Sequence, residues 1–600
     1  MCGIYGVWSE RGAHSNEAFS TALAHRGPDD AGTWQRGGLL LGHRRLSIID
    51  LSDDGHQPFT SPDGRYTVVY NGEVYNYLEL REELLRVGAS FESDTDTEVL
   101  LQAWAHWGER ALDRIFGMFA FALWDAQDEK LVLVRDATGM KPLLYVGGED
   151  EPFAFASEMK AFVGLPGFSV EVDESAAREY LGAGFIWSGD HSVVAGVHRL
   201  PPGHLMEVED GRPRPPRRWW TPPNPTPLSR PVHEALDREA DELLDVLREA
   251  VGQHLRADVP VGLMLSGGLD SSVLAALAAQ VSTRPIRTIT MGFEPYEADE
   301  RDYAQAVATH VGSDHTEFVL RPADAADELR RSARFYDDLF WDTGTVPAFA
   351  GFRFCREAGL KVVLVGEGAD ELFGGYPPFR RLGGPLADRL PRRLNAYRFF
   401  RAYAWQRYDE RVPAFVRLIL DLYERADRDW FQTVRLFELE VQLPVNLNMK
   451  VDRASMASSV EARVPYQDRR VAEFALRTPS TLLLEPGGRG QPMRGKWLLR
   501  HMARRHGLVP EAVLDRAKMG TPIPSGWLTD ERDFADEATR ALLAPGSWAS
   551  RLGLSRTIGP FLRERRRPLF LRPLLKYLHP APLMWRLLIL EAWSRAYSAR

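Results

Sequence analysis

Apolar residues in the second half of the chain form short runs, and segments with helical spacing separate them. The runs occupy residues 259–265, 286–291 and 361–365, and their β-branched content is typical of buried parallel strands. Residues 233–254 and 273–279 carry apolar positions at helical spacing. Strands and helices that alternate in this way predict a doubly wound parallel sheet, an α/β fold that binds ligands at the carboxyl ends of its strands.

The first two hundred residues follow a different pattern, in which apolar and polar residues alternate. Residues 66–70, 117–125 and 130–136 have the period of half-buried strands, and 77–87 and 93–101 have the spacing of helices. A strand is also expected within 42–52, and a tight turn at Asn71-Gly72-Glu73. This half therefore predicts an α+β domain built on paired strands.

Prolines mark the border between the halves. They cluster within residues 201–231, where neither a helix nor a central strand can form, so this stretch predicts an extended crossing. We expect domains at 1–210 and 235–600, joined by a proline-rich linker at 211–234. The last 70 residues, rich in Leu, Arg and Trp, are expected to form helices that cover the sheet of the second domain.

Composition narrows the class of protein. The chain has 600 residues, too many for one core, and a formal net charge of −9 that argues against a nucleic-acid partner. Two cysteines, Cys2 and Cys355, exclude a disulfide framework and fit a reducing compartment. No apolar window is long enough to span a bilayer and no secretory leader is evident, so we expect a soluble cytoplasmic protein without a membrane partner.

The string SGGLDSS, residues 266–272, lies between the strand 259–265 and the helix that follows it. Gly267 and Gly268 let the backbone approach an anion, and the helix N-terminus favours a phosphate there. Hydroxyls of Ser266, Ser271 and Ser272 add donors, and the Asp270 carboxylate suits Mg²⁺. No lysine follows the glycines, so this is not the loop used for γ-phosphoryl transfer.

A second string, 490–496, does match G-x-x-x-x-G-K, but Trp497 occupies the hydroxyl position and no strand precedes it. An acidic cluster follows the strand 361–365. It contains Glu367, Asp370 and Glu371, and Asp370 with Asp270 forms the natural pair for Mg²⁺. The alternative for this cluster is a helix start with acidic residues on its dipole.

The chain opens MCGIYG, and removal of Met1 would leave a thiol and a free α-amine on Cys2. The α-amine can act as general base to that thiol, so no separate histidine is required. Asn71 and Gly72 offer a side-chain amide and a backbone N–H, the donors from which an oxyanion hole is made.

MCGIYG, HRGPDD, RRLSIID, YNGEVYN, SDTDTEVLL, GMFAFALWD and FASEMKA, in this order, resemble the glutaminase domain of class II glutamine amidotransferases. The resemblance covers about the first 200 residues and implies an N-terminal-nucleophile αββα fold. It implies that Cys2 forms a γ-glutamyl thioester and that Asn71 and Gly72 form the oxyanion hole. The implied glutamine contacts are Arg45 for the carboxylate, Leu46 and Ile48 through the backbone, Asn71, Gly72, and Glu73 and Asp96 for the α-ammonium.

The second half resembles the synthetase domain of glutamine-dependent asparagine synthetases over residues 235–530. SGGLDSS, similar to the pyrophosphate loop of ATP pyrophosphatases, GEGADELFGGY, KVDRASM, EARVP and GKWLLR carry this resemblance. It implies that Glu367 acts as a general base during ammonia attack or promotes formation of the intermediate, and that Lys496 stabilises negative charge on phosphate. The implied ATP-binding residues are Leu265, Ser266, Gly267, Gly268, Asp270, Ser271, Ser272, Met291, Val365 and Gly366, with Mg²⁺ on Asp270 and Asp370.

The departures from that family concern the acceptor acid. Within 335–349 the residues Asp338, Leu339, Trp341 and Gly344 differ from the usual pattern, as do Val365 and the string YQD at 466–468. The acceptor is therefore aspartate or another carboxylic acid, with glutamine and ATP as the other substrates. The resemblance makes a homodimer plausible, whereas the residues lining an internal ammonia path cannot be identified from the sequence.

Two further classes of protein fit the sequence less well. A scaffold protein with dead sites has no chemical reason to keep Cys2, Asn71, Asp270, Glu367 and Lys496 together. A glutamine-dependent sugar-phosphate aminotransferase would share the first domain but has no need of the loop at 266–272.

Overall fold

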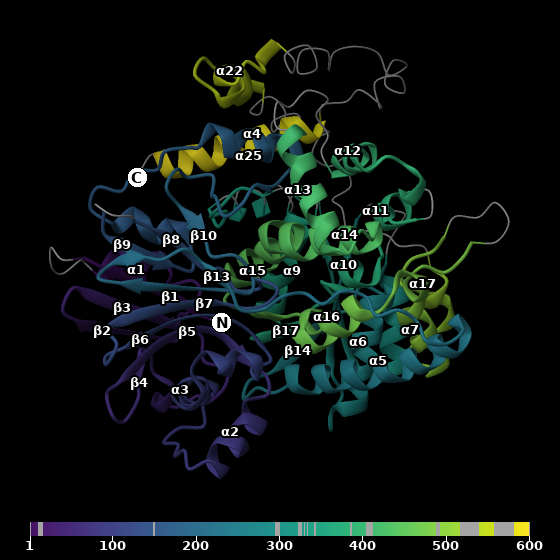
Figure 1. Ribbon diagram of the computed structural model, residues 1–600, viewed down its shortest axis with the longest axis horizontal. Coiled ribbons are helices and arrows are strands. Elements are labelled where there is room, and N and C mark those ends of the chain that lie inside the picture. The colour runs from purple at the N-terminus through teal and green to yellow at the C-terminus, as the bar shows by residue number, and fades with distance from the viewer. Residues whose placement is uncertain are drawn as a thin grey trace.

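The computed structural model describes residues 2–9, 16–147, 151–294, 300–321, 324, 327–328, 331–332, 334–340, 342, 344–384, 387–403, 412–487, 493–516, 539–556 and 581–598. Two domains lie side by side, the first drawn in purple and blue and the second in teal and green (Figure 1). The fold is α+β in the first domain and α/β in the second, as predicted.

The first domain is a sandwich of two antiparallel sheets. One sheet has the order β10 (His198–Arg199), β8 (Leu144–Val146), β9 (Phe153–Ala156), β1 (Gly3–Trp8), β3 (Leu39–Arg45), β2 (Asp30–Arg36). The other has the order β12 (Arg212–Pro213), β11 (His204–Glu209), β7 (Lys130–Arg135), β6 (Gly117–Asp125), β5 (Tyr66–Val74), β4 (Phe59–Thr60), with β13 (Arg217–Arg218) on β11. Apolar side chains from both sheets, such as Ile4, Val69 and Leu133, fill the space between them.

Helices cover both outer faces of this sandwich. α2 (Tyr77–Arg86) and α3 (Asp96–Trp107) cover the sheet that contains β5. α1 (Asn16–Ala22), α4 (Glu174–Ala183) and the C-terminal α25 (Ala581–Ser598) cover the sheet that contains β1. The layers are therefore αββα, the arrangement that the family resemblance implies.

A five-stranded parallel sheet forms the centre of the second domain. Its order is β16 (Asp314–Leu320), β15 (Arg287–Phe293), β14 (Val261–Met264), β17 (Val362–Leu364), β18 (Glu461–Arg463). α5 (Val232–His254), α6 (Leu269–Val281) and α7 (Arg301–Val311) pack on one face, and α9 (Thr345–Glu357) and α15 (Asn448–Met456) on the other. Because side chains alternate along β17, Leu364 enters the first of these cores and Val363 the second.

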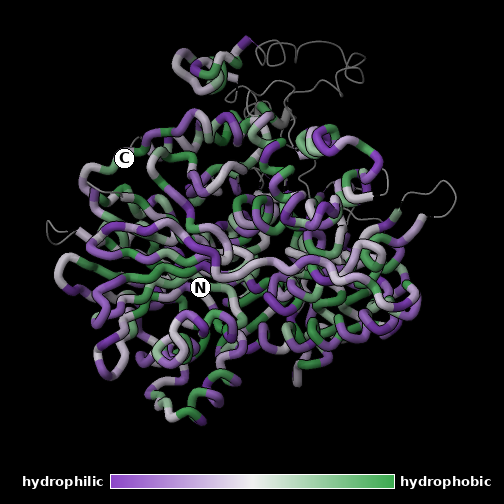
Figure 2. The backbone as a smooth tube through the Cα atoms, viewed as in Figure 1, coloured by the Kyte–Doolittle hydropathy of each residue, from purple (hydrophilic) through white to green (hydrophobic). Residues whose placement is uncertain are grey.

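Further helices extend the second domain. They are α10 (Ala369–Phe373), α11 (Pro377–Leu382), α12 (Arg392–Tyr403), α13 (Val412–Arg425), α14 (Trp430–Phe437), α16 (Arg469–Arg477), α17 (Ser480–Leu483), α18 (Trp497–Arg505) and α19 (Glu511–Leu514). The later helix α22 (Trp548–Arg551) instead joins the core that contains α4 and α25. A π-helical segment, η5 (Glu438–Leu447), runs directly into α15. Figure 2 shows hydrophobic residues along the interior strands and hydrophilic ones toward the outer helices and loops.

The structure corrects four expectations about elements. Residues 71–73 are not a turn, because β5 continues through them and pairs with β6 as far as Val74. The strand expected within 42–52 ends at Arg45, and Leu46 and Ile48 beyond it pack into the core between the domains. The segment 443–468 is predicted to begin as a helix and to end in a turn, whereas its residues 461–463 form the edge strand β18.

The fourth correction concerns the C-terminus. α25 does not cover the parallel sheet but packs on α4, where Arg586 donates to the carbonyl oxygens of Leu181 and Gly182 at 2.8 Å each. Leu587, Leu590 and Trp593 join the apolar core on that face of the first domain. The end of the chain thus returns to the first domain, as the yellow helix beside α4 shows (Figure 1).

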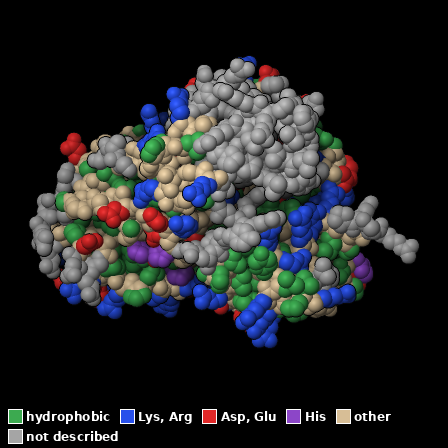
Figure 3. Space-filling view, turned by 90° about the horizontal axis from the view of Figure 1, so that it is seen from above, with side chains coloured by type: hydrophobic (Ala, Val, Ile, Leu, Met, Phe, Trp, Pro, Cys, Tyr) green, Lys and Arg blue, Asp and Glu red, His purple; other side chains and the backbone are tan. Residues whose placement is uncertain are grey.

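The surface mixes charges of both signs. Acidic and basic side chains are interspersed on the face shown in Figure 3. Within the part of the chain that the structure describes, no helix combines the length and the apolar character needed to cross a bilayer.

Candidate active sites

Cys2 immediately precedes β1 and is almost completely buried, with 8% of its surface exposed. Its backbone nitrogen donates to Asn71 Oδ1 at 2.9 Å, and Arg26 Nε donates to its carbonyl oxygen at 3.0 Å. Burial raises the pKa of the Cys2 thiol. A thiol held in this protonated state needs a base before it can act as a nucleophile. The nitrogen of Cys2 itself is the candidate base.

Asn71 reaches Cys2 from β5 in the opposite sheet, so the two sheets of the sandwich meet at the nucleophile. Asn71 is fully buried, and its Nδ2 has no hydrogen-bond partner among the described residues. A side chain at Gly72 would collide with the carbonyl oxygen of Met118, because a Cβ there would lie 2.1 Å from it. Beside Cys2, strand β5 therefore presents the side-chain amide of Asn71 and the backbone of Gly72, where there is no room for a side chain.

The predicted glutamine-binding carboxylates lie near this strand. Asp96, in the first turn of α3, accepts from Tyr70 Oη and from the backbone N–H of Val74, each at 2.9 Å. Burial raises the pKa of Asp96 to about 6, and burial also raises the pKa of Glu73 well above its ordinary value. Glu73 Oε2 has no hydrogen-bond partner among the described residues. The buried carboxylates Glu73 and Asp96 are not fully balanced by positively charged side chains. They are therefore suited to bind the ammonium group of a ligand.

Arg45 has a different local role from the one predicted for it. Its guanidinium donates to the carbonyl oxygens of Ser52, at 2.8 Å, and Asp50. It therefore fixes the loop that follows β3, while Leu46 and Ile48 on this loop are buried between the domains. Whether Arg45 also contacts the glutamine carboxylate stays a prediction.

Two residues of the second domain enter this first site. Arg463, fully buried on β18, has Nη2 3.4 Å from Glu73 Oε1, and its Nε donates to Glu461 Oε1 at 2.6 Å. Arg463 also donates to the carbonyl oxygens of His254 and Arg256. The string EARVP is visible in the sequence. Only the position of β18 in the structure shows that Glu461 and Arg463 face the glutamine site predicted in the first domain.

The predicted ATP-binding residues converge at the carboxyl ends of three neighbouring strands. Leu265 and Ser266 follow β14, Met291 lies in β15, and Val365 and Gly366 follow β17, and both of those strands pair with β14. Gly267 has a φ of +65°, and a Cβ on it would lie 2.6 Å from the backbone nitrogen of Ala304. This backbone conformation favours glycine, so the turn that starts α6 depends on it.

Serine hydroxyls tighten the same loop. Ser266 Oγ lies 3.0 Å from Ser271 Oγ and accepts from the N–H of Gly268 at 3.3 Å. Ser272 Oγ is buried without a hydrogen-bond partner among the described residues. The first turn of α6 thus offers backbone N–H groups and hydroxyls at one point, as an anion site requires.

Lys496 joins the two predicted metal ligands. Its Nζ lies 2.6 Å from Asp270 Oδ2 and 2.6 Å from Asp370 Oδ1. Burial alone would lower the pKa of Lys496, but the two carboxylates outweigh it and raise that pKa above the ordinary value. Lys496 also has a φ of +58°, a conformation that is uncommon for residues other than glycine.

Glu367 follows β17 and lies beside a second ion pair. Lys450 Nζ donates to Asp342 Oδ2 at 3.1 Å, and burial raises the pKa of Glu367 while Lys450 partly opposes the shift. A carboxyl whose pKa is raised is suited to accept a proton near neutral pH. Lys450 opens the string KVDRASM, and its residue type alone indicates no role for it.

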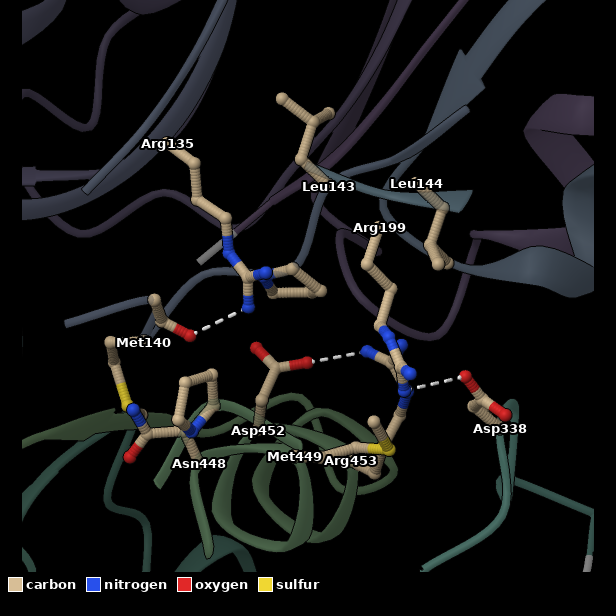
Figure 4. A pocket seen from close by; sticks show the side chains of 13 residues that line it. Arg135, Met140, Leu143, Leu144, Arg199, Asp338, Asn448, Met449, Asp452 and Arg453 are labelled. Carbon is tan, nitrogen blue, oxygen red and sulfur yellow. Dashed lines mark hydrogen bonds and ion pairs between the residues drawn. The ribbon is translucent and has the colours of Figure 1, made fainter. Parts of the chain in front are cut away.

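An ionic network and a small cavity connect the two domains. Arg26 is fully buried and binds Asp452 of α15 through two bonds, at 2.7 and 2.9 Å, and Glu158 at 2.7 Å. The cavity beside this network has room for about one water-sized molecule. In Figure 4, Arg135 and Arg199 extend from the first domain toward Asp452 and Asp338 of the second.

Comparisons with known proteins place both halves of the chain. Residues 1–220 match the glutamine amidotransferase domain family, and residues 242–595 match the asparagine synthase family. A protein of Mycobacterium tuberculosis (strain ATCC 25618 / H37Rv) described as a putative glutamine-hydrolysing asparagine synthetase is 34% identical over 593 residues, covering 88% of each chain. Glutamine-hydrolysing asparagine synthetase 1 of Bacillus subtilis is 32% identical over 579 residues, also covering 88% of each chain.

Proposed function

This chain belongs to the asparagine synthase family, and from that premise we propose that it is a glutamine-dependent synthetase that makes asparagine from aspartate. Glutamine and ATP are its other substrates, and the products are asparagine, glutamate, AMP and pyrophosphate. The observation that carries the proposal is the pair of complete sites in one chain: Cys2 with Asn71 in the first domain, and Lys496 with Asp270 and Asp370 in the second.

Glutamine is hydrolysed at Cys2 in this proposal. After Met1 is removed, the α-amine of Cys2 takes the thiol proton and the sulfur attacks the side-chain amide carbon of glutamine. Asn71 Nδ2 and the N–H of Gly72 donate to the oxyanion that develops, and ammonia leaves with the proton held by the amine. Water then hydrolyses the thioester to glutamate. The hydrogen bond from the Cys2 nitrogen to Asn71 Oδ1 supports this arrangement. It occupies the oxygen of the Asn71 amide and leaves Nδ2 available to donate to the oxyanion.

The acceptor is activated in the second domain. Its side-chain carboxylate attacks the α-phosphate of ATP, pyrophosphate leaves, and ammonia then displaces AMP from the acyl adenylate. Lys496 opposes the charge that develops on phosphate, and Glu367 takes a proton from the attacking ammonia. Two carboxylates that both reach Lys496 Nζ at 2.6 Å fit Mg²⁺, which Asp270 and Asp370 would hold and which would neutralise phosphate charge.

An apolar core between the two sites supports internal transfer of ammonia. It contains Leu46, on the loop after β3, together with Met140, Val451 and Val365, and Val365 directly precedes Gly366 and Glu367. Free ammonia is mostly protonated at neutral pH and then no longer nucleophilic, whereas a dry route preserves the neutral molecule. We propose that ammonia follows this core.

Two of the sequence departures contact the first domain and its C-terminal helix. Asp338 accepts from the N–H of Val193 and from Arg199, each at 3.0 Å, and Leu339 is buried in the core that contains α4 and α25. The contacts of these two positions therefore explain their residue types without a different acceptor acid. Trp341 lies outside the described residues. The alternative acceptor acid stays open until products are identified.

The domain borders, a homodimer and a cytoplasmic location stay predictions. β12 and β13, within the predicted linker, pair with β11, and α5 begins at Val232. We propose that the first domain extends to about β13 and that the crossing occupies the residues before α5.

Replacement of the nucleophile tests the division of labour. With Cys2→Ala, glutamine-dependent synthesis should disappear while synthesis from ammonium salt and ATP persists, because the two sites do not share residues that perform chemistry. A Cys355→Ala variant serves as the matched control, since Cys355 is buried in the second domain. Loss of ammonia-dependent synthesis in a folded Cys2→Ala protein would contradict the proposal.

A further inference from the structure

A hairpin outside both active sites gathers two histidines and an aspartate. Asp190, His191 and His198 each offer a ligand atom, and these atoms all lie within 4.8 Å of one another. His198 Nδ1 is 3.2 Å from Asp190 Oδ2, and His191 Nδ1 is 3.9 Å from Asp190 Oδ1. We propose that these three side chains bind a divalent transition-metal ion of the Zn²⁺ class.

The donor set and its spacing suit that ion. Two imidazole nitrogens and a carboxylate oxygen are the usual protein ligands of Zn²⁺ in sites that keep one position for water. Tetrahedral ligands about 2.1 Å from zinc are about 3.4 Å apart, and the two imidazoles lie 3.2 Å and 3.9 Å from the two carboxylate oxygens of Asp190, so small side-chain rotations bring one oxygen into range of both. The His191 side chain is 55% exposed, so an ion can enter and water can complete its coordination.

The backbone fixes these ligands before any ion binds. Ser192 N donates to the carbonyl oxygen of Val197 at 3.0 Å, and Arg199 N donates to that of Asp190 at 2.6 Å. His191 and His198 are antiparallel bridge partners, so their side chains project from the same side of the hairpin. Binding therefore needs only small rotations of side chains, which limits its entropic cost.

A neighbouring tyrosine orients two of the ligands. Tyr145 Oη donates to Asp190 Oδ2 at 3.1 Å, and its ring stacks on that of His198 with centroids 5.3 Å apart. Outer partners of this kind hold metal ligands in their binding orientation. His198 Nδ1 is buried, and its contact with Asp190 Oδ2 at 3.2 Å lacks hydrogen-bond geometry, so a metal ion between the two atoms would satisfy both.

The hairpin also contacts the second domain. Asp338 accepts from Val193 N and from Arg199 Nη1, both at 3.0 Å, and Arg199 directly follows the ligand His198. An ion that cross-links His191 to His198 would hold the hairpin closed and with it this contact. Metal binding should therefore raise the melting temperature of the whole chain.

The test is a calorimetric titration of the full chain with ZnCl₂, prepared without a histidine tag. A Cys2→Ala background removes the thiolate as a competing ligand. We expect one equivalent of Zn²⁺ to bind, with affinity at least about tenfold weaker in both His191→Ala and His198→Ala. His233→Ala is the matched control, since this histidine is exposed and lies 3.9 Å from a single carboxylate, Glu234.

Co²⁺ provides a spectroscopic check, because four-coordinate Co²⁺ absorbs visible light far more strongly than the aqueous ion. The absorption should appear with the background protein and His233→Ala, and be lost in His191→Ala. His191 is exposed, so its removal should leave the fold intact, as circular dichroism would verify. No binding to the background protein, or unchanged affinity in both hairpin variants, would overturn the site. Because the background lacks Cys2, this result does not depend on the proposed glutamine chemistry.

Discussion

In the proposed glutamine site, individual residues meet two separate electrostatic requirements. Cys2 and Asn71 make the reacting end, where a buried thiol depends on the nitrogen of its own residue for activation. Glu73 and Asp96 make the other end, where two buried carboxylates have raised pKa values because water is excluded. Glutamine brings the missing ammonium, so binding and ionisation of these carboxylates are linked.

This linkage predicts how glutamine affinity depends on pH. Asp96, with a pKa of about 6, must lose its proton to attract the ammonium, so protonation below that pH weakens binding. The dissociation constant of glutamine for the Cys2→Ala protein should rise about tenfold between pH 7 and pH 5 and stay nearly constant above pH 7. Calorimetric titrations of this inactive protein separate binding from catalysis.

The control for this titration is Asp96→Asn in the same background. Its affinity should be weak at every pH, with a flatter profile, because the titrating group is gone while the acceptor oxygen for Val74 can remain. A parent profile that stays flat from pH 5 to pH 7.5 would remove Asp96 from the ammonium site.

At the scale of single elements, β18 links the sites. This short strand lies at the edge of the synthetase sheet, yet Arg463 on it reaches Glu73 in the first domain. We expect Arg463→Lys to raise the KM for glutamine about tenfold, since a charge-assisted contact to Glu73 is weakened. The KM for ammonia and the kcat of ammonia-dependent synthesis should stay unchanged, because Arg463 would act only by positioning Glu73.

Arg353→Lys is the matched control for this strand variant. Arg353 is an arginine of α9 that pairs with Glu357 at 2.8 Å, away from both sites, so glutamine kinetics should remain at the parent level. Equal losses of the glutamine and ammonia reactions in Arg463→Lys would mean that Arg463 only supports the fold.

Sequence patterns predicted most elements that carry their own periodicity. The helices α2, α5 and α6 and the strands β6, β7 and β14 were expected close to their observed positions. Tertiary contacts decided the remainder. Asn-Gly at 71–72 favours a turn locally, but pairing along β6 extends β5 through it. Three-residue β18 is too short to show a period, and its parallel partner β17 lies about a hundred residues earlier.

The same distinction applies to the candidate sites. Cys2, Asp270 and Glu367 belong to motifs in which the residue types alone indicate the chemistry of the site. Arg463 and Lys450 act through position alone, and only the packed structure shows what they face. The predicted assignments of glutamine and ATP contacts remain to be tested by the experiments proposed above.

At the scale of the whole molecule, a buried ionic network joins the domains. Arg26, in the first domain, binds Asp452 of α15 with two hydrogen bonds and also donates to the carbonyl oxygen of Cys2. Loss of the Asp452 charge leaves Arg26 buried with fewer partners, a change that costs about 3–5 kcal/mol for comparable buried pairs. The network therefore holds the nucleophile and the interface together.

Asp452→Asn should uncouple the two reactions. The yield of asparagine per glutamine hydrolysed should fall several-fold, because a loosened interface lets ammonia escape, while ammonia-dependent synthesis persists. Parallel assays of glutamate and asparagine measure this ratio. Asp29→Asn is the control, since Asp29 forms a half-exposed pair with Lys361 across the domains at 2.9 Å. An unchanged ratio in Asp452→Asn would exclude this role for the network.

The most direct test of the account is pyrophosphate release by the purified chain with ATP, Mg²⁺ and glutamine, in the presence and absence of aspartate. Mass spectrometry of the same reactions identifies the amide product. The account predicts aspartate-dependent pyrophosphate, matched one to one by asparagine. Glutamine hydrolysis without aspartate-dependent pyrophosphate would contradict aspartate as the acceptor and direct the search to other carboxylic acids.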